Sequence, residues 1–566
     1  MSKITESEKV ENVPHTTSGG IFVKTLPWLL ALLSGAMIGA CFPPLDHPSL
    51  HWLPWVALSP LCWALWMLPR PVVPRAWARQ AFFLGWVTGS LSFLISLFWI
   101  TTVTIPGWIL LSLVVGLYPG CWALFAALVL RPLGESQDTP TAWLRSFRNL
   151  LVALLAAAAW VALEWLRGTL FSGFGWNTLG IALRGSIPLI QIAGITGTAG
   201  LTFLLILGSA TATITIERVC REIRIARARP HFDFMIAVMI VVMVFSYGVR
   251  KIMTPSRETI PLRVVGVQGN IPVAYYWDTK YDALIMQRYL QRSRQALALH
   301  PDLVVWPEAA TPQPLLEDEI TYDEVKDLAI ATDADFLIGS VHYEAVPRGG
   351  YNSAILLSEH GEKAQFYNKT HLVPFGEYVP FRHSFPLLSW IVGDRVPNDF
   401  DAGKGPGVLT LSVKPVKIAS LICFEDTLGD LTRRFAGLGA QLLITITNDG
   451  WFEHSVATRQ HLANAQLRTV ETGLPLIRVA DTGISCAIDR LGRIQQILHG
   501  PDGSTFTEGV LDATLDIPIH PETTFYTRHG ELFAQGCLAA TLAATGAALL
   551  ALRRSRRGSF KRILPQ

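Results

Sequence analysis

Long apolar segments constrain this chain more than any other feature of its sequence, and most of them lie in the first 250 residues. A helix of about 20 apolar residues crosses the roughly 30 Å hydrocarbon core of a bilayer and satisfies its own backbone polar groups. Only 16% of the residues are charged, against about a quarter in soluble proteins. We therefore predict a multi-span α-helical membrane bundle with eight transmembrane helices, at about residues 26–42, 52–68, 81–100, 108–130, 150–166, 195–216, 234–247 and 532–552.

Arginines mark every second connection between these segments. Basic residues accumulate in short loops on the cytoplasmic side of a membrane, so the alternation indicates the orientation. The basic connections contain Arg70, Arg75 and Arg79; Arg131, Arg145 and Arg148; Arg218, Arg221, Arg224, Arg227 and Arg229; and finally Arg553, Arg554, Arg556 and Arg557. With Lys24 also inside, we expect both termini in the cytoplasm and the domain between the seventh and eighth spans outside it. The net charge of +3 gives no global basic field, so no nucleic-acid partner is expected.

The same pattern divides the chain into five parts. Residues 1–20 are polar, lack a signal-peptide cleavage site and are expected to form a disordered cytoplasmic tail. Residues 21–250 are expected to form the membrane bundle of seven helices and residues 261–528 an extracytoplasmic domain. The eighth helix is expected at 532–552, followed by a basic cytoplasmic tail at 553–566.

Within residues 261–528 the apolar runs shorten to strand length and alternate with amphipathic helices. Strands rich in Val and Ile that alternate with helices are typical of an α/β domain with a largely buried sheet. The predicted strands lie in LRVVGVQ, LVVWPEA, FLIGSVHYE, YNSAILLS, KIASLIC, LLITITND, LIRVAD and ISCAID, and the predicted helices near residues 280–298, 322–332, 428–438 and 457–472. No metal-ligand spacing and no phosphate-binding glycine loop is present in the sequence, so neither a metal nor a cofactor is expected.

Cys423 stands where such a domain would present a nucleophile. The apolar run of residues 417–422 ends at this cysteine, and Glu425 and Asp426 follow at once. Strand ends that face a cleft are where open α/β folds bind ligands, whereas most free cysteines are small buried hydrophobes. The chain has seven cysteines, an odd number, which does not indicate a disulfide framework. Cys486, in ISCAID, is expected in the core.

Two other motifs of this domain place a charged side chain after a strand. Glu308 lies at the end of LVVWPEA, and Lys369 lies in QFYNKTHLVPFGEYVPF. Thiol acyl transfer requires these three types of group. Glu308 would take and return the thiol proton, Lys369 would stabilise the anionic tetrahedral intermediate, and Cys423 would carry the acyl group. Taken singly, Lys369 also fits a solvated lysine and Glu308 a turn carboxylate, so the hypothesis depends on their joint occurrence.

Two stretches near the predicted membrane surface are open to more than one interpretation. In EWLRGTLFSGFGWNTLG, Glu164 and Arg167 lie one helical turn apart. The pair suits either a lipid headgroup or an interfacial ion pair beside an aromatic belt that includes Trp176. The stretch PFGEYVPF, which carries the aromatic residues Phe375, Tyr378 and Phe381, is either an arm that covers the cleft and contacts lipid or a surface loop.

The motifs WPEA at Glu308, YNKTHLVPFGEYVP at Lys369 and ICFED at Cys423 resemble the Glu-Lys-Cys triad motifs of the nitrilase superfamily. GNIP, NDGWF, RVADTGIS, the EWLRGTLFSGFGW loop and the eight-span layout are similar to its membrane branch, the apolipoprotein N-acyltransferases. Two departures from the family pattern are Phe424, where Tyr is frequent, and Gly450, where Ala is common.

The resemblance implies an α/β/β/α sandwich resting on a membrane bundle in the bacterial inner membrane, with the catalytic domain on the periplasmic side. Cys423 is then expected to take the sn-1 acyl chain of a phospholipid, typically phosphatidylethanolamine, as a thioester. The acceptor is expected to be the α-amine of the diacylglyceryl cysteine of an apolipoprotein. The resemblance also implies that Glu377 and Glu425 support the site and that Trp451 and Glu471 belong to the wider active site.

Two other functions fit parts of the sequence. A membrane-tethered amidase or nitrile hydrolase would use the same triad with water as the acceptor, but a soluble amide requires no membrane bundle. A transporter or lipid scaffold is disfavoured because the spans carry few charged residues at mid-membrane depth, where transport sites usually lie. His454 and His461 are left out of the catalytic set, because histidines near helix starts are more often structural or exposed.

Overall fold

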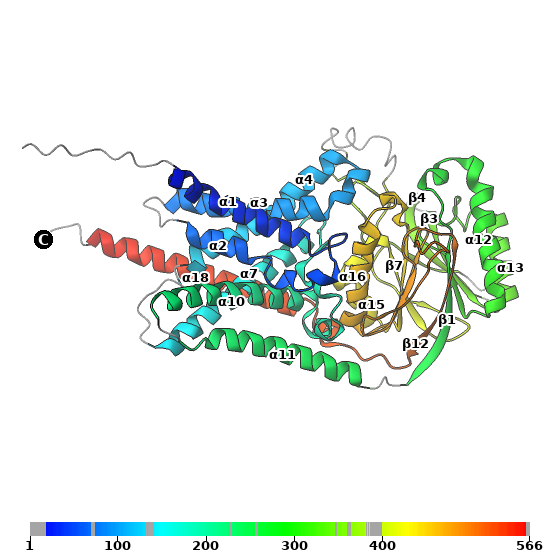
Figure 1. Ribbon diagram of the computed structural model, residues 1–566. Helices are drawn as coiled ribbons and strands as arrows, with labels where there is room; N and C mark the ends of the chain where they lie inside the picture. The colour runs from blue at the N-terminus through cyan, green and yellow to red at the C-terminus, as the bar shows by residue number, and fades with distance from the viewer. Residues whose placement is uncertain are drawn as a thin grey trace, which may run out of the picture.

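The computed structural model describes residues 18–561 apart from 69–73, 132, 134–140, 227–228, 255–257, 346–347, 359–363, 381, 383 and 385–398. Within these residues, a bundle of helices stands beside a domain of two β-sheets that has helices of its own (Figure 1). The first helix begins, and the last helix ends, at the edge of the bundle that faces away from the sheets (Figure 1). Of the two expected tails, residues 1–17 and 562–566 lie outside the described residues.

The bundle consists mainly of apolar helices. Its helices are α1 Ser18–Gly39, α2 Ser59–Met67, α3 Pro74–Ser96, α4 Ile105–Val115, α5 Leu117–Phe125, α7 Ala142–Thr169, α8 Ile187–Ile190, α9 Ala193–Thr196, α10 Thr198–Arg224, α11 Phe232–Met253 and α18 Leu532–Lys561. Small residues bring some of these helices close together, as is usual for helix packing in membranes. A Cβ on Gly85 of α3 would lie 2.4 Å from the carbonyl oxygen of Pro119 in α5, so only glycine permits this contact.

Five helical stretches of the described chain are long and apolar enough to cross a membrane: Ile105–Leu130, Ala142–Thr169, Thr198–Arg224, Phe232–Met253 and Leu532–Arg554. They coincide with five of the predicted spans, so the predicted number of eight is not confirmed. The first predicted span corresponds to a shorter apolar helix, Lys24–Gly39.

The prediction of one continuous helix over residues 52–68 is wrong. A 3-10 helix at Leu53–Trp55 comes first, and α2 begins only at Ser59. Pro54 and Pro60 explain the break, because proline has no amide hydrogen and is tolerated only in the first turn of a helix. The third predicted span also ends early, since a 3-10 helix at Phe98–Thr102 follows α3.

The second domain contains two six-stranded sheets, in the orders β12-β1-β2-β3-β4-β5 and β11-β10-β9-β8-β7-β6. In each sheet three neighbouring strands are parallel, β1 with β2 and β3, and β7 with β8 and β9. The strands of the first sheet are β1 Thr259–Gln268, β2 Leu303–Val305, β3 Asp335–Ala345, β4 Arg348–Leu357, β5 Gln365–Asn368 and β12 Gly509–Pro518. Those of the second sheet are β6 Leu409–Thr410, β7 Lys417–Ile422, β8 Leu442–Thr447, β9 Leu476–Ala480, β10 Cys486–Ile488 and β11 Ile494–Ile497.

The sheets pack face to face, and each carries a layer of helices on its outer side. Along β2, Leu303 and Val305 pack against the second sheet, while Val304 packs beneath α12 Asp282–Ala296 and α13 Glu319–Thr332. Because successive side chains of a strand point to opposite faces, a strand buried on both faces is a continuous apolar run. The other layer is formed by α15 Gly429–Gly437 and α16 Ala457–Thr472. The predicted α/β/β/α sandwich is therefore confirmed.

Four strands were not predicted from the sequence: β5, β6, β11 and β12. The largest omission is β12, which pairs with β1 from Gly509 to Pro518 and closes the edge of the first sheet. Its burial alternates and its sequence, GVLDATLDIP, mixes acidic with apolar residues. A strand with one exposed face is harder to recognise from its sequence than a strand buried on both faces. The position of β12 is set by its pairing with β1.

Helix α16 joins the two parts of the molecule, lying between the second sheet and the bundle (Figure 1). Leu462 and Ala465 pack toward the sheet, whereas Ala463, Leu467 and Val470 belong to the hydrophobic core of the bundle. Nearly every residue of this helix is buried. The sheet domain is thus seated on the bundle through a shared core rather than attached only by the chain.

Candidate active site

The chain turns sharply at Cys423, directly after β7. This residue has φ of 54° and begins a 3-10 helix, Cys423–Thr427. A non-glycine residue in the left-handed region costs energy that its surroundings must repay, and such residues cluster at functional sites. The Cys423 thiol is hydrogen-bonded to the Thr447 side chain at the end of β8. Burial, followed by the nearby Glu308 carboxylate, raises the pKa of the thiol well above its usual value, although Lys369 opposes this shift.

Glu308 follows β2 in a loop that crosses closely over β3. A Cβ on Gly339 would lie 2.1 Å from the Pro307 carbonyl oxygen, so this crossing requires glycine. The Glu308 carboxylate is 6% exposed. It accepts hydrogen bonds from Asn352 Nδ2 at 2.8 Å and from the amide of Asn448 at 3.1 Å. These donors fix the carboxylate toward the space that it shares with Lys369 and Cys423.

Lys369 follows β5, and its ammonium group is enclosed between two carboxylates. Its Nζ donates to Glu377 Oε1 at 2.9 Å and lies 3.4 Å from Glu308 Oε1, and the residue is only 1% exposed. Burial alone lowers the pKa of this lysine, but the charges of Glu377 and Glu308 outweigh burial and raise it above the usual value. Lys369 therefore remains a fixed cation.

Two carboxylates hold these groups in place. Glu377 Oε2 accepts from the amide of Val373, which turns its other oxygen toward Lys369. Glu425 is fully buried and joins the segment after Lys369 to the end of β7: it accepts from the amides of Thr370, at 2.8 Å, and Ile422, at 2.9 Å. The position of Cys423 relative to Lys369 is set by this bridge.

Asn352 is a site residue that the sequence did not predict. Its Nδ2 donates to Glu308 Oε1 at 2.8 Å and to Glu377 Oε1 at 2.9 Å, so it holds the two carboxylates that flank Lys369. The sequence offered one signal, an amide as the second residue of the strand motif YNSAILLS. A buried polar side chain needs a partner, and such a side chain inside a strand therefore points to a site.

A second charged cluster lies beneath the Cys423 turn. His461 Nε2 lies 2.9 Å from Asp426 and 3.2 Å from the Cys423 carbonyl oxygen, and Nδ1 lies 3.1 Å from Asp449. Arg478 donates to both carboxylates, Asp426 at 2.8 Å and Asp449 at 2.9 Å. Burial and Arg478 lower the pKa of His461, but the two carboxylates prevail and raise it to about 9. Two cations and two anions compensate one another here, which suits a structural role.

Other predicted site residues lie farther from the triad. Trp451 is 49% exposed and meets Trp277 edge to face, with ring centroids 6.2 Å apart. Glu471 is buried at the junction with the bundle, where it accepts from the amide and hydroxyl of Thr198, the first residue of α10, and pairs with Arg468. Glu471 thus connects α16 to a helix N-terminus, where a carboxylate is favourable. The exposed Trp277 was not predicted from the sequence.

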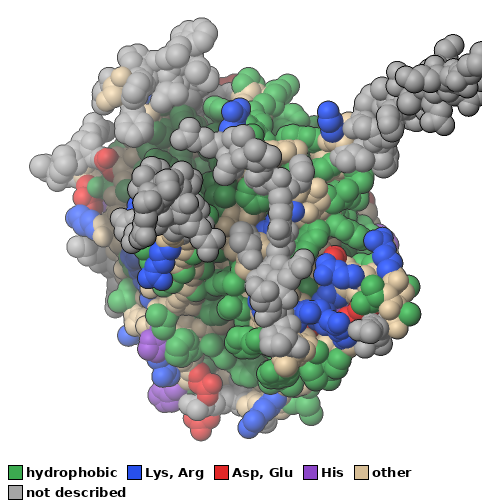
Figure 2. All heavy atoms as spheres, turned by 90° about the vertical axis from the view of Figure 1, so that its left-hand side faces the viewer, with side chains coloured by type: hydrophobic (Ala, Val, Ile, Leu, Met, Phe, Trp, Pro, Cys, Tyr) green, Lys and Arg blue, Asp and Glu red, His purple; other side chains and the backbone are tan. Residues whose placement is uncertain are grey.

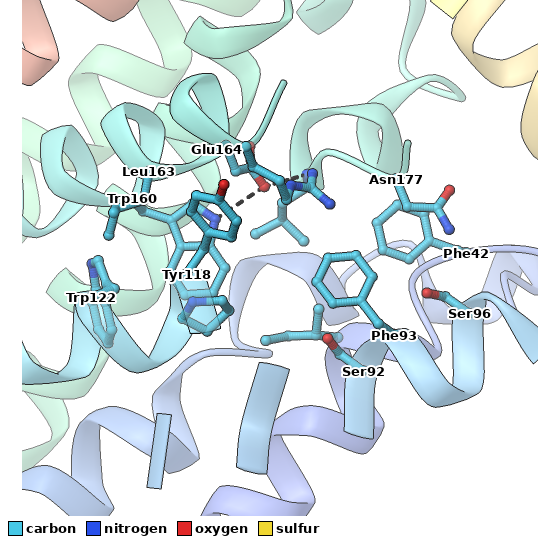
Figure 3. A pocket seen from close by; sticks show the side chains of 14 residues that line it. Phe42, Ser92, Phe93, Ser96, Tyr118, Trp122, Trp160, Leu163, Glu164 and Asn177 are labelled. Atoms are coloured by element: carbon cyan, nitrogen blue, oxygen red, sulfur yellow. Dashed lines mark hydrogen bonds between the residues drawn. The ribbon is translucent and has the colours of Figure 1, made fainter. Parts of the chain in front are cut away.

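Arg167 and Trp176, which the sequence offered as possible lipid or interface contacts, are only 4% and 3% exposed. Arg167 donates to the Trp176 carbonyl oxygen at 3.0 Å and lies over the ring of Phe93. Glu164 accepts from Trp160, from the amide of Leu179 and from Thr202, at 2.8 to 3.1 Å. Figure 3 shows Glu164 and Trp160 beside a pocket lined by residues of α1, α3, α5 and α7. Arg167 and Trp176 therefore lie inside the protein, and Glu164 is half-buried at this pocket.

The segment after Lys369 forms a tight loop. Phe375, with φ of 63°, donates from its amide to the Tyr378 carbonyl oxygen at 2.7 Å, and Glu377 donates to that of Val373 at 2.9 Å. Phe375 is 49% exposed at the tip, and Tyr378 is half-buried. Glu377 points inward to Lys369, so one loop carries a site residue and an exposed aromatic ring. Phe381 lies outside the described residues.

Comparisons with known proteins match both parts of the chain. The sequence profile described as "Apolipoprotein N-acyltransferase N-terminal domain" matches residues 34–211, and the profile described as "Carbon-nitrogen hydrolase" matches residues 263–519. An apolipoprotein N-acyltransferase from Geobacter metallireducens is 34% identical over 94% of this chain and 96% of its own length. One from Rhodopseudomonas palustris is 30% identical over the same shares.

A solved amidase from a Nesterenkonia species covers 50% of this chain and 98% of its own, with 18% identity and a TM-score of 0.35. The bundle and the sandwich are therefore matched by two separate profiles, and named relatives align with both in one continuous chain. This protein belongs to the apolipoprotein N-acyltransferase family, membrane acyltransferases of the carbon-nitrogen hydrolase superfamily.

Proposed function

We propose that this protein transfers the sn-1 acyl chain of a phospholipid, through a thioester on Cys423, to the α-amine of the diacylglyceryl cysteine of an apolipoprotein. The observation that carries the proposal is the convergence of Glu308, Lys369 and Cys423 from three strand ends, with Lys369 Nζ 3.4 Å from Glu308 Oε1. The family supports a lipid donor and a lipoprotein acceptor, and phosphatidylethanolamine is the donor we infer.

In the first half-reaction, Cys423 attacks the ester carbonyl carbon of the donor. Burial keeps the thiol neutral at rest, so its proton must leave during the attack, and the Glu308 carboxylate is the base beside it. A carbon–sulfur bond forms, and the carbonyl oxygen becomes an oxyanion that the Lys369 ammonium stabilises. When the intermediate collapses, the carbon–oxygen bond breaks and the leaving alkoxide takes the proton back from Glu308. The products are a thioester and a lysophospholipid.

In the second half-reaction, the amine of the acceptor attacks the thioester. Glu308 removes a proton from the nitrogen, Lys369 again stabilises the oxyanion, and the sulfur leaves and is protonated by Glu308. Because a thioester forms and the lysophospholipid leaves before the acceptor amine reacts, the kinetics should be ping-pong. Glu377 and Asn352 hold Lys369 and Glu308, while Glu425 holds the turn that carries Cys423.

The alternative function is hydrolysis by the same triad, and incubation with donor alone separates the two. We expect phospholipid without acceptor to yield about one equivalent of lysophospholipid and then to stall, because a transferase must keep water from its thioester. Hydroxylamine should cleave the stalled adduct. A diacylated lipopeptide with a free amine should discharge it, and an N-acetylated copy of that peptide is the matched control. Continuous release of fatty acid without acceptor, at the rate of transfer, would refute the transferase in favour of the hydrolase.

We further propose that the protein lies in the bacterial inner membrane with its sandwich on the periplasmic side. Figure 2 shows Lys and Arg side chains among the hydrophobic ones on the end of the bundle that faces away from the sheets. Basic residues at the ends of spans on this side include Arg218, Arg221 and Arg224 of α10 and Arg553 and Arg554 of α18. An excess of Lys and Arg is typical of the cytoplasmic segments of membrane proteins.

Reporter fusions test the orientation. An alkaline phosphatase fused after Gly349 is expected to be active, and one fused after Arg557 inactive, because only the first would reach the periplasm. Green fluorescent protein at the same two positions serves as the reciprocal reporter and should give the opposite pattern. Phosphatase activity after Arg557 together with fluorescence after Gly349 would invert the proposed topology.

A further inference from the structure

Gln460, in the second turn of α16, has every hydrogen-bonding position of its side chain occupied, and the residue is only 1% exposed. Its Oε1 accepts from Trp99 Nε1 at 3.1 Å, Trp176 Nε1 at 2.8 Å and Asn177 Nδ2 at 3.0 Å. Its Nε2 donates to the carbonyl oxygens of Pro43 and Ser96, both at 2.8 Å. The five partners belong to three separate segments of the N-terminal half, which follow or end α1, α3 and α7. One amide from the sheet domain therefore ties together three segments of the bundle.

One of these partners leads directly to the nucleophile. The ring of Trp176 stacks on that of Phe424, with centroids 6.1 Å apart and planes at 6°. Phe424 follows Cys423 in the chain, and on another side it stacks with His371 at 5.9 Å. His371 lies two residues after Lys369 and donates its amide to Glu425. Gln460 is thus connected, through the rings of Trp176 and Phe424, to the segments that carry Cys423 and Lys369.

A second connection runs through the chain itself. His461 follows Gln460 in the chain, and the centroids of the His461 and Trp176 rings are 5.4 Å apart. The Nε2 atom of His461 lies 3.2 Å from the Cys423 carbonyl oxygen. Cys423 has a left-handed φ of 54°, a conformation that persists only where its surroundings enforce it. From the bundle side, Trp176 contacts Phe424 and His461, and it is held by its hydrogen bond to Gln460.

We infer that Gln460 is a positioning residue that couples the membrane bundle to the nucleophile turn. It acts through Trp176 and Phe424, and it touches none of the reacting groups itself. The inference rests on the proposed role of Cys423 in acyl transfer. Its chemistry requires an amide, since the group must accept from three donors and donate to two carbonyl oxygens at once. A carboxylate would face the Pro43 and Ser96 oxygens without a proton, and an apolar side chain would leave all five partners unsatisfied.

The test compares Gln460→Met and Gln460→Glu with a matched control, Gln466→Met. Gln466 lies on the same helix and is 7% exposed. It donates to the carbonyl oxygen of Arg184 in the bundle at 3.3 Å and to that of Gly492, between β10 and β11, at 2.7 Å. Neither of these two hydrogen bonds involves a residue of the Trp176 stack. The readout is the single-turnover rate of Cys423 thioester formation from phosphatidylethanolamine in mixed micelles, measured over a range of donor concentrations, together with the midpoint of thermal unfolding.

We expect both Gln460 variants to lower the acylation rate at saturating donor by about 10²-fold, because a shift near 1 Å at a reacting group lowers a rate by this factor. The half-saturating donor concentration should stay within about twofold of that of the parent. Gln466→Met should leave the acylation rate unchanged even where it lowers the unfolding midpoint. Equal acylation by the parent and both Gln460 variants would overturn the inference. The inference would also be overturned if Gln466→Met lost acylation rate in proportion to its loss of stability. The rate would then depend on the stability of the whole junction between α16 and the bundle and not on Gln460 in particular.

A double-mutant cycle with Phe424→Leu tests the route. If Gln460 acts through the ring stack, Gln460→Met should cost little further rate in the Phe424→Leu background, since coupled residues are not additive. Fully additive losses would refute the route. The parent is measured first: no thioester in the parent would refute the proposed function, and this inference with it, whereas normal acylation of the parent and of Gln460→Met would refute the inference alone.

Discussion

Replacing Cys423 with alanine is expected to abolish the acyl-enzyme completely, with no lysophospholipid released from donor. No other described thiol can substitute, because the sulfur must lie at the turn where Glu308 and Lys369 converge. The measurement is the intact mass of the enzyme after incubation with phospholipid, followed by mass mapping of the peptide that contains residue 423. The adduct should appear in the parent and be absent from the variant.

Cys486→Ala provides the matched control for this experiment. Cys486 is fully buried in β10, and burial raises the pKa of its thiol to about 12, so it is a core residue with no access to substrate. Its replacement should leave acylation intact and cost only stability, through the small cavity that it creates. An adduct of acyl mass on the Cys423→Ala enzyme would contradict the proposed nucleophile.

Replacing Lys369 with alanine is expected to lower the acylation rate by about 10² or more, which is what removal of one oxyanion-stabilising donor usually costs. The structure adds a second effect. The Glu308 and Glu377 carboxylates would lose the buried cation between them, and breaking a buried pair typically costs about 3–5 kcal/mol of stability. Single-turnover rates must therefore be normalised to folded enzyme, which size-exclusion chromatography and thermal unfolding in detergent can quantify.

The control for Lys369 is Lys404→Ala, because the Lys404 side chain is 91% exposed and its ion-pair partner is Glu344, which is neither carboxylate of the Lys369 pair. Methylammonium added to the Lys369→Ala enzyme fits the space that the side chain leaves and should restore part of the rate, which a merely unfolded variant would not show. Turnover of Lys369→Ala within about tenfold of the parent would exclude the proposed role.

Glu308 and Cys423, which the sequence predicted, each follow a predicted strand, whereas Lys369 follows β5, a strand that was not predicted. Glu308 and Cys423 follow apolar runs that can be recognised without a partner, because a strand buried on both faces is apolar at every position. Polar groups at the ends of parallel strands predict a site. Glu308 and Cys423 follow strands of different sheets, β2 and β7, so the packing of the two sheets brings them together.

Asn352 and Gln460 could not be predicted in this way, because their roles depend on contacts that cross the fold. Asn352 meets Glu308 only because β4 lies beside β3 and β5 in the first sheet. Gln460 binds the Pro43 carbonyl oxygen across 417 residues of chain. The sequence around Asn352 and Gln460 resembles that around many other buried amide side chains. Their roles are therefore visible only from the residues to which they hydrogen-bond in the folded protein.

The sequence by itself determined the membrane character of the chain, the α/β character of residues 261–528 and the three groups of the proposed triad, because hydrophobic periodicity and strand-end motifs are local properties; the sandwich was implied by the family resemblance. Tertiary structure decided the place of β12, because its pairing with β1 is not indicated by its own local pattern. It also decided that Arg167 and Trp176 lie inside the protein, since a side chain near a membrane surface faces lipid or protein according to the helices packed beside it. Burial is a property of the assembled fold, and residue type alone does not fix it.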